Sequence, residues 1–434
     1  MKRKFGLVTR FAIFILSLTC LTSSQLCAQT NGQKNQTFGS SLKRPKTNTT
    51  DRLNKDADRK TENDASRDII RVDTSLVLLD VLVTDARAAK PISGLTKDDF
   101  IITEDGQRQE ISFFAPGDDA QQLPRSIVLI FDRSNSELPY LDASVEAAKK
   151  LVNQLAPTDE MAIVTDDIDL AIGFTKDKKQ LKRTLDSLKR RTLEGYRTRS
   201  MQFSALLATL RELVDVTKRR PIIIFQADGD EIGALSKWPP IAGEQVPEYD
   251  YDMNDIYSEV EKSRTKIYTV VPNDKLVGLS EQEATERARL MLEKQRVARA
   301  RNQDMWYGLK RLPPQANSRP PVAGTSATVF RIPAGGLKKF EEKSTQRAVA
   351  TFVQGQAAAA KVAELTGGWA SFLETPEQAA EIYGRILSDI NQRYVIGYYP
   401  TNKQLDGTLR SIRIDVLNPE YVIQGRRSYY ALPR

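Results

Sequence analysis

The sequence predicts an α/β fold in which buried parallel strands alternate with amphipathic helices. Two short runs, 127–131 and 221–225, are almost entirely apolar. Such runs are typical of strands that are covered on both faces of a parallel sheet. Between them, residues 141–155 show apolar residues at spacings of four and three, which predicts a helix with one buried face. This alternation predicts a doubly wound parallel sheet within residues 122–393.

The first residues of the chain have the pattern of an export signal. Four basic residues within the first ten positions precede an apolar run, 11–18, that is too short to span a bilayer. We therefore predict a signal peptide over residues 1–28 and an exported protein, either periplasmic or extracellular. A retained N-terminal anchor is the alternative, and it would be the only membrane attachment. Residues 29–68 are polar without an apolar period and are predicted to form a disordered tether.

Two β-rich segments flank the α/β region. Residues 69–118 contain an Asp-Gly pair between two short apolar runs, which predicts a hairpin with Asp105 in the turn. Residues 394–434 return to a β pattern after the last predicted helix. Neither segment is long enough to form a stable sheet pair alone. Since the ends of a domain often lie close together, we expect 69–118 and 394–431 to form one β-sandwich around an inserted α/β domain.

A cluster of tyrosines in the C-terminal segment has two interpretations. It could form a binding platform, or the rings could pack across strands, which is the commoner arrangement and is favoured here. The residues are Tyr394, Tyr398, Tyr399, Tyr429 and Tyr430.

Residues 274–350 interrupt the strand–helix alternation. They contain a highly charged helical run, 281–301, followed by a stretch rich in Pro, Arg and Ser. We interpret this part as an insertion. A solvated helix with a loop is favoured over a partner-recognition element, because charged surface helices are common.

The composition excludes several kinds of chemistry. The chain has no histidine, and its two cysteines, Cys20 and Cys27, lie in the predicted signal peptide. Structural disulfides, Cys or His zinc sites and Ser-His or Cys-His catalysis are therefore excluded in the mature chain. The net charge of +8 falls to +4 when the four basic residues of the signal are removed, so nothing indicates nucleic acid as a partner.

Any metal site must then use oxygen ligands, and two predicted strands end in suitable loops. The first strand is followed by Asp132, Ser134 and Ser136, and the second by Asp228. Carboxylate and hydroxyl oxygens suit Mg²⁺, with Mn²⁺ or Ca²⁺ as alternatives. Parallel strands present such loops at one edge of the sheet. Arg133 lies within the first loop and opposes cation binding unless an anion lies nearby.

Other acidic residues near these loops are interpreted as loop or turn residues and not as metal ligands. Asp166, Asp167 and Asp169 follow a short predicted strand, where paired carboxylates could support acid–base catalysis. A solvated loop tip is the favoured interpretation. Asp230 is interpreted as a turn residue.

Short motifs occur along most of the predicted mature chain, at 94–100 (GLTKDDF), 104–106 (EDG), 131–136 (FDRSNS), 227–229 (ADG), 365–368 (LTGG), 394–400 (YVIGYYP) and 427–430 (RSYY). Taken together, these motifs resemble the bacterial VWFA-related family of the von Willebrand factor type A superfamily. The resemblance implies a Rossmann-like domain with a metal-ion-dependent adhesion site, whose ion keeps one position open for an acidic group of a protein partner.

The resemblance also implies roles for single residues. Asp132, Ser134 and Ser136 match the first metal loop, and Asp228 matches the later acidic residue. The family's middle ligand is a threonine before the third helix. Here the motif differs, and Ser200 falls at that position with Thr198 close by.

We therefore expect a non-enzymatic adhesion or protein-binding module. The alternative is an envelope scaffold whose metal site is vestigial. A metal-assisted hydrolase is the least favoured reading, because such enzymes usually need a base beside the metal. The chain has no histidine, and no glutamate lies within 132–136 or 226–230.

Overall fold

The computed structural model describes most of the predicted α/β and β regions. The described residues are 37–42, 76–88, 90–116, 124–134, 136–194, 200–214, 219–231, 251–309 and 334–432. The predicted signal peptide lies outside these ranges, as does most of the predicted tether. Every element below belongs to one unit, Phe38–Arg434.

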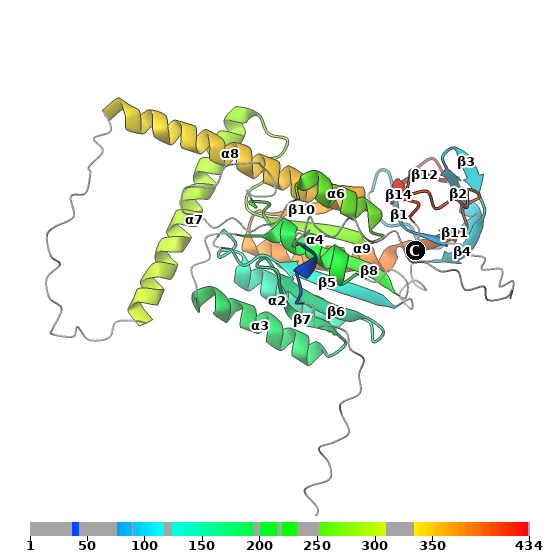
Figure 1. Cartoon of the computed structure of the whole chain (residues 1–434), viewed down its shortest axis with the longest axis horizontal. Coiled ribbons are helices and arrows are strands. Elements are labelled where there is room, and N and C mark those ends of the chain that lie inside the picture. The colour runs from blue at the N-terminus through cyan, green and yellow to red at the C-terminus, as the bar shows by residue number, and fades with distance from the viewer. Residues whose placement is uncertain are drawn as a thin grey trace, which may run out of the picture. The chain divides into compact units, whose positions relative to one another are not determined.

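A six-stranded sheet forms the centre of the α/β part, in the order β10-β9-β8-β5-β6-β7 (Figure 1). All neighbouring strands are parallel except β6 and β7, which are antiparallel. The chain starts in the middle and winds outward to both sides, as in doubly wound folds. The predicted α/β class is confirmed. The strands are β5 (Arg125–Phe131), β6 (Glu160–Thr165), β7 (Asp169–Thr175), β8 (Arg220–Gln226), β9 (Lys266–Pro272) and β10 (Ala370–Leu373).

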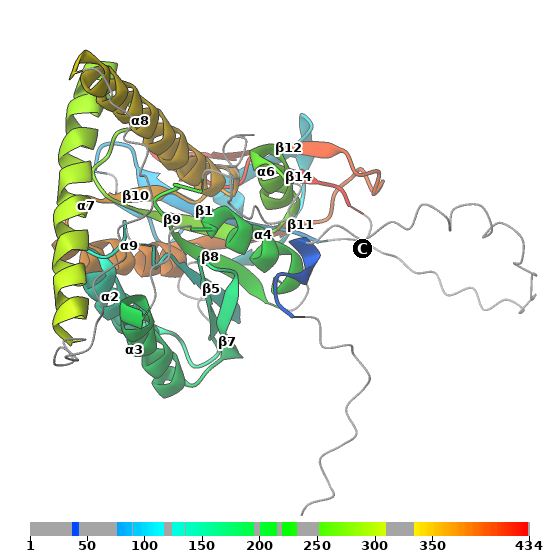
Figure 2. The ribbon, with the colours of Figure 1, turned by 60° about the vertical axis from the view of Figure 1, so that its left-hand side comes forward.

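Helices cover both faces of this sheet (Figure 2). Every residue of β5 is buried. Alternate residues, such as Leu129 and Ile130, enter two separate cores on opposite faces. The Leu129 face packs against α2 (Leu141–Gln154), α3 (Lys178–Glu194) and α9 (Ala379–Gln392). The Ile130 face packs against α4 (Gln202–Glu212), α6 (Met253–Lys262) and α8 (Ala334–Leu365).

The two β-rich segments that flank the α/β part build one β-sandwich, as predicted. Its sheets have the orders β13-β1-β11-β4 and β14-β12-β2-β3, so each sheet combines strands from both segments. Leu79, Ile102 and Ile412 lie in one shared core. The strands are β1 (Val77–Asp85), β2 (Phe100–Glu104), β3 (Gln107–Gln109), β4 (Ile111–Ala115), β11 (Tyr394–Tyr398), β12 (Leu409–Val416), β13 (Tyr421–Gln424) and β14 (Ser428–Tyr430).

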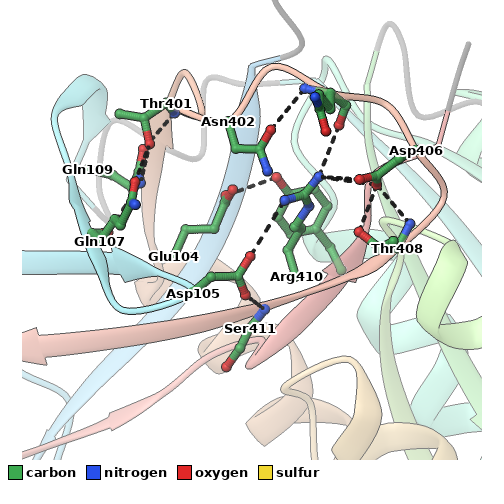
Figure 3. A network of polar contacts seen from close by, with 12 residues as sticks. Glu104, Asp105, Gln107, Gln109, Thr401, Asn402, Asp406, Thr408, Arg410 and Ser411 are labelled. Atoms are coloured by element: carbon green, nitrogen blue, oxygen red, sulfur yellow. Dashed lines mark hydrogen bonds and ion pairs between the residues drawn. The ribbon is translucent and has the colours of Figure 1, made fainter.

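Polar contacts hold the tip of the sandwich together. Asp105 and Gly106 form the β2–β3 turn with positive φ angles of 48° and 81°, as the Asp-Gly pair predicts. Arg410 of β12 pairs with Asp105 at 3.7 Å and with Asp406 at 3.1 Å (Figure 3). These contacts tie the β2–β3 turn to the loop between β11 and β12.

The tyrosines of the C-terminal segment mostly pack inside the sandwich. Tyr394, Tyr398 and Tyr429 are buried in its core. The hydroxyls of Tyr398 and Tyr429 donate hydrogen bonds to Glu104 at 2.7 and 2.9 Å. For these three residues, cross-strand packing is the observed role.

The sandwich contacts the amino ends of the parallel strands. Asp80 of β1 forms an ion pair with Arg220, the first residue of β8. The ammonium group of Lys266, the first residue of β9, donates to the Asp80 carbonyl at 3.3 Å. The loops with the predicted metal ligands follow the carboxyl ends of these strands, so they lie at the opposite edge of the sheet.

Two observations differ from the sequence predictions. Helix α8 begins at Ala334, inside the predicted insertion 274–350, because 334–365 is rich in helix-forming residues and lacks proline. Together with α7 (Glu281–Leu309), it spans most of the predicted insertion. Within the predicted tether, residues 37–42 are ordered. Leu42 of the short helix η1 (Ser40–Leu42) is buried, and Glu212 of α4 accepts two of this segment's backbone N–H groups at 2.8 Å.

None of the helices in the described ranges combines the length and the apolar character that crossing a membrane requires.

Candidate metal centre

Three loops meet where β5, β6 and β8 end. Phe131, the last residue of β5, pairs with Thr165 of β6 and with Gln226 of β8. The backbone N–H of Asp132 donates to the Gln226 carbonyl at 3.1 Å. The two predicted metal loops are therefore held side by side.

Three carboxyl groups from these loops form a tight cluster. Asp132, Asp228 and Asp230 each offer a carboxylate oxygen, and these oxygens all lie within 4.8 Å of one another. Asp230, interpreted as a turn residue, does lie in a turn, since its N–H donates to Asp228 Oδ1 at 3.2 Å, but its side chain also joins the cluster. Gly229 between the two later aspartates has a φ of 83°, and this left-handed turn brings both side chains into the same cluster. The Asp-x-Asp pair directly after a buried strand is the sequence feature that could have indicated Asp230 as a member of the cluster.

The first loop folds around its own aspartate. The N–H of Ser134 donates to Asp132 Oδ1 at 2.7 Å, and the hydroxyls of Ser134 and Ser136 lie 2.8 Å apart. All three side chains are buried. Asp132 Oδ2 is buried without a hydrogen-bond partner among the described residues. This loop therefore presents a carboxylate oxygen that nothing described in the protein satisfies.

The segment before α4 adds further polar groups. Ser200 is buried, and its hydroxyl has no hydrogen-bond partner in the described part of the chain. Thr198, the alternative ligand, lies outside the described residues. Gln202, which the sequence analysis did not single out, donates through Nε2 to Asp228 and Asp230 at 2.8 Å each, while its Oε1 accepts the Gly229 N–H at 2.9 Å. The first residue of α4 thus orients the second acidic loop.

A buried carboxylate fixes the start of α4. Glu231 accepts the N–H groups of Phe203 and Ser204 at 2.5 and 3.1 Å, and it also bonds to the Ser204 hydroxyl. These N–H groups have no partner inside the helix. Glu231 therefore holds α4, and with it Gln202, against the second acidic loop.

Arg133 does not oppose the acidic cluster with a free charge. Its guanidinium group donates to Asp167 at 3.1 Å and lies 3.9 Å from a carboxylate oxygen of Asp166. Asp166 is fully buried and also accepts the Arg133 backbone N–H at 3.1 Å. The solvated-loop interpretation is therefore wrong for Asp166, which balances Arg133 instead. Asp166 and Asp167 thus supply the negative charge beside Arg133.

Another buried carboxyl group, that of Glu137, directly follows the first loop in the sequence. Glu137 is fully buried, its Oε1 has no hydrogen-bond partner among the described residues, and its Oε2 lies 3.5 Å from the Gln226 amide nitrogen. Glu137 directly follows the Asp-x-Ser-x-Ser motif and so lies just outside the loop residues 132–136. Burial and the charges of Asp228 and Asp230 raise the pKa of Glu137 well above its usual range.

The cluster is electrostatically strained without a cation. Burial, followed by the charges of Asp166 and Asp228, raises the pKa of Asp132 well above its ordinary value. Burial raises the pKa of Asp230 in the same direction, and Asp228 adds to this effect. Like charges in a buried site disfavour ionisation. A bound cation would relieve this repulsion.

The residues fit a hard divalent cation. The donors are carboxylate and hydroxyl oxygens, as Mg²⁺ and Ca²⁺ prefer. Asp228 Oδ2 is also buried without a hydrogen-bond partner within the described ranges, like Asp132 Oδ2. Buried polar atoms are normally paired, so these two oxygens are available as ligands for a cation.

No protein-family model matches this sequence, and no curated protein matches it either. Several solved structures are similar in fold. The vWF domain of the type V pili tip protein Mfa5 from Porphyromonas gingivalis is 10% identical, with a TM-score of 0.31 over 62% of this chain and 95% of that chain. An aerotolerance-related membrane protein from Bacteroides fragilis is 12% identical, with a TM-score of 0.29 over 61% of this chain and 98% of that chain.

Other similar structures align over shorter stretches. Proximal thread matrix protein 1 from the mussel byssus, solved with a zinc-occupied MIDAS motif, is 14% identical, with a TM-score of 0.26 over 37% of this chain and 40% of that chain. This chain spans 66% of the solved chain of BatB from Bacteroides thetaiotaomicron. At these identities and TM-scores, the likeness supports no conclusion about this chain.

The strand order decides the type of fold. In chain order, the central strand β5 is followed by β6 and the antiparallel edge strand β7 on one side, and by β8, β9 and β10 on the other. Helices cover both faces, and the acidic loops follow the carboxyl ends of the central strands β5 and β8. The α/β part of this chain is therefore a doubly wound, mostly parallel six-stranded sheet that carries its acidic loops at the carboxyl edge.

Proposed function

We propose that this chain binds a divalent cation at the acidic cluster and uses it, outside the cytoplasm, to bind a protein partner. One observation supports this most: Asp132, Asp228 and Asp230 converge within 4.8 Å, and buried oxygens of Asp132 and Asp228 have no hydrogen-bond partner among the described residues. A folded chain keeps such a repulsive group of carboxylates only where something compensates it.

The proposed ligand set is small enough to leave a position open. It contains Asp132, Ser134, Ser136 and Asp228, with Ser200 or Thr198 as the middle hydroxyl, and Asp230 beside them. Mg²⁺ takes six oxygen ligands and usually keeps several waters, and Mn²⁺ or Ca²⁺ accept similar oxygen sets. When bound, the ion would supply a positive charge to which an acidic side chain of a partner could add as a ligand. The proposed function is therefore recruitment of a partner's acidic group.

The acidic cluster does not favour an enzyme. The chain has no histidine, and the glutamate nearest to the first loop, Glu137, is fully buried. A general base must reach the substrate or a water beside it. Phosphatase or nuclease turnover that requires Mg²⁺ would argue for the hydrolase alternative instead.

Calorimetric titration with Mg²⁺ and Mn²⁺ tests the metal site. We expect the protein to bind one ion and Asp132→Ala to abolish binding, because this change removes a ligand from the centre of the cluster. Asp142→Ala is the matched control, since Asp142 has a side chain that is 85% exposed on α2. No heat of binding with the unchanged protein would contradict the proposal.

Capture of partners from envelope extract tests the recruitment step. We expect proteins that bind the unchanged chain to be lost with chelator and with Asp132→Ala, and to be retained with Asp142→Ala. Partner capture that is indifferent to chelator and to Asp132→Ala would support the alternative of a scaffold with a vestigial metal site.

A further inference from the structure

The second acidic loop makes a backbone-to-backbone contact with helix α8. Gly229 lies between Asp228 and Asp230, and a Cβ atom built on it would lie 2.2 Å from the carbonyl oxygen of Gly355 in α8. The contact is reciprocal, since a Cβ on Gly355 would lie 2.2 Å from the Gly229 carbonyl oxygen. Real Cβ atoms essentially never come closer than 3.0 Å to such atoms. Both positions therefore require glycine in this arrangement.

The same turn of α8 also holds the neighbouring loop. Gln356 is buried, and its Oε1 accepts the backbone N–H groups of Leu276 and Val277 at 2.9 and 3.3 Å. Its Nε2 donates to the Asp274 carbonyl at 2.9 Å. One turn of α8 thus contacts the loops after both β8 and β9.

A glycine inside a helix needs a reason. Glycine is less stable than alanine in a helix interior, because its backbone loses more freedom on folding. Gly384 in α9 shows the contrast: a Cβ there would meet nothing within 4 Å. At Gly355, the missing side chain is what allows the acidic loop to approach.

We propose that Gly355 is a positioning residue for the metal centre, which seats the loop that carries Asp228 and Asp230 against α8. This inference rests on the proposed metal binding. It also links the metal centre to α8, the helix that completes the insertion between β9 and β10. Because the two backbones are in contact, a shift of the loop on metal binding would displace this turn of α8. A displacement of α8 would likewise shift the loop.

The first test compares two glycine-to-alanine changes in the full chain by titration with Mg²⁺. We expect Gly355→Ala to weaken Mg²⁺ affinity by about 10-fold or more, as losses of groups that orient metal ligands do. Gly384→Ala places the same residue in another helix and should leave the affinity unchanged. Equal Mg²⁺ affinity for Gly355→Ala and the unchanged protein would overturn the inference and leave the proposed function intact.

The second test needs no bound metal. Hydrogen exchange of the peptide 226–231 in metal-free protein should be faster in Gly355→Ala than in the unchanged protein or in Gly384→Ala. Unchanged exchange would overturn the inference. Because this comparison is made without an ion, it tests whether Gly355 seats the acidic loop even if the unchanged protein binds no Mg²⁺, a separate result that would overturn the proposed function.

If Gly355→Ala does not fold, hydrogen exchange of the unchanged protein with and without Mg²⁺ tests the inference. Saturating Mg²⁺ should slow exchange at residues 352–359 of α8 while residues 178–189 of α3 stay the same. Binding of Mg²⁺ without any change at 352–359 would overturn the inference.

Discussion

At the scale of single residues, the acidic cluster concentrates negative charge in a buried place. Asp132, Glu137 and Asp228 are all less than 3% exposed, and Asp230 is only partly exposed. The one arginine in the first loop, Arg133, is paired with Asp166 and Asp167 rather than with this cluster. Buried carboxylates without a counter-charge destabilise a fold. The cluster therefore lowers the stability of the fold unless a cation compensates its charge.

This repulsion among buried carboxylates predicts that Asp132→Asn stabilises the metal-free protein. The asparagine keeps an oxygen to accept the Ser134 N–H, which Asp132 accepts at 2.7 Å, and it removes one charge. Burial and nearby carboxylates raise the pKa of Asp132, so folding disfavours its ionised form. We expect the free energy of unfolding in urea with chelator to rise by about 1–2 kcal/mol. The exposed Asp142→Asn should change it by less than about 0.5 kcal/mol. A loss of stability in Asp132→Asn would show that the cluster is not repulsive.

Some residues of the cluster were predictable and others were not. The Asp-x-Ser-x-Ser motif and Asp228 each follow an apolar strand, so local pattern and sheet geometry together located them. Gln202 has no such signal, because its partners lie 26 and 28 positions away and only the fold brings them together. Asp230 was missed because its direction depends on the positive φ of Gly229.

At the scale of elements, the start of α4 decides how well the second acidic loop is ordered. Glu231 receives two N–H groups from the first turn of α4, where a negative charge also interacts favourably with the helix dipole. Gln202 in the same turn holds Asp228 and Asp230. The helix and the loop therefore stabilise each other.

We expect Glu231→Ala to lower the free energy of unfolding by about 1–3 kcal/mol, since it leaves buried N–H groups without partners. Chemical denaturation measures this change. Glu286→Ala, at an exposed position of α7, should have no comparable effect. Equal stability of the two variants would show that Glu231 does not cap α4.

Elements with strong local signals were predictable. The apolar run of β5 and the Asp-Gly turn between β2 and β3 appear where the sequence indicates them. The full length of α8 and the docking of residues 37–42 were not predictable. Leu42 is isolated in a polar stretch, and only its burial against the α4 face of the sheet reveals its role.

At the scale of the whole molecule, the sandwich and the α/β part share a polar junction. Asp80 of the sandwich pairs with Arg220, and Arg393 donates to the Asp80 and Gln424 carbonyls at 3.4 and 3.2 Å. Burial raises the pKa of Asp80, but Arg220, Lys266 and Arg393 lower it more, so that it lies below the ordinary value. The junction therefore favours the ionised form of Asp80.

This shift makes the junction sensitive to acid. A carboxyl group whose pKa is lower in the folded state stabilises the fold above its unfolded pKa of about 3.9, and this contribution is lost as the pH falls through the lower folded pKa. We expect Asp80→Asn to reduce the free energy of unfolding by about 1–3 kcal/mol at pH 7, and the difference to shrink below about pH 4. Denaturation curves between pH 3 and 7 measure it, with the exposed Asp98→Asn as control. A difference that does not depend on pH would contradict this account of Asp80.

The architecture was predictable because it follows from the hydrophobic periodicity of the chain and from the small number of strands in each β-rich segment. Alternating strands and helices indicated the α/β class, and too few strands at each end indicated that both ends share one sandwich. The junction was not predictable, since Asp80, Arg220 and Arg393 lie in different elements and show no common pattern in the sequence. We propose that the α/β part is an insertion within the sandwich, as the boundaries 69–118, 122–393 and 394–434 suggest.

The most direct test of the metal centre is a crystal structure of the protein grown with Mn²⁺ and measured at the manganese absorption edge. Our account predicts one strong anomalous peak among the oxygens of Asp132, Ser134, Ser136 and Asp228, at about 2.0–2.4 Å from its ligands, and no such peak in Asp132→Ala. The absence of a peak at this cluster in the unchanged protein, or a peak only at another acidic group such as Asp105 and Asp406, would contradict it.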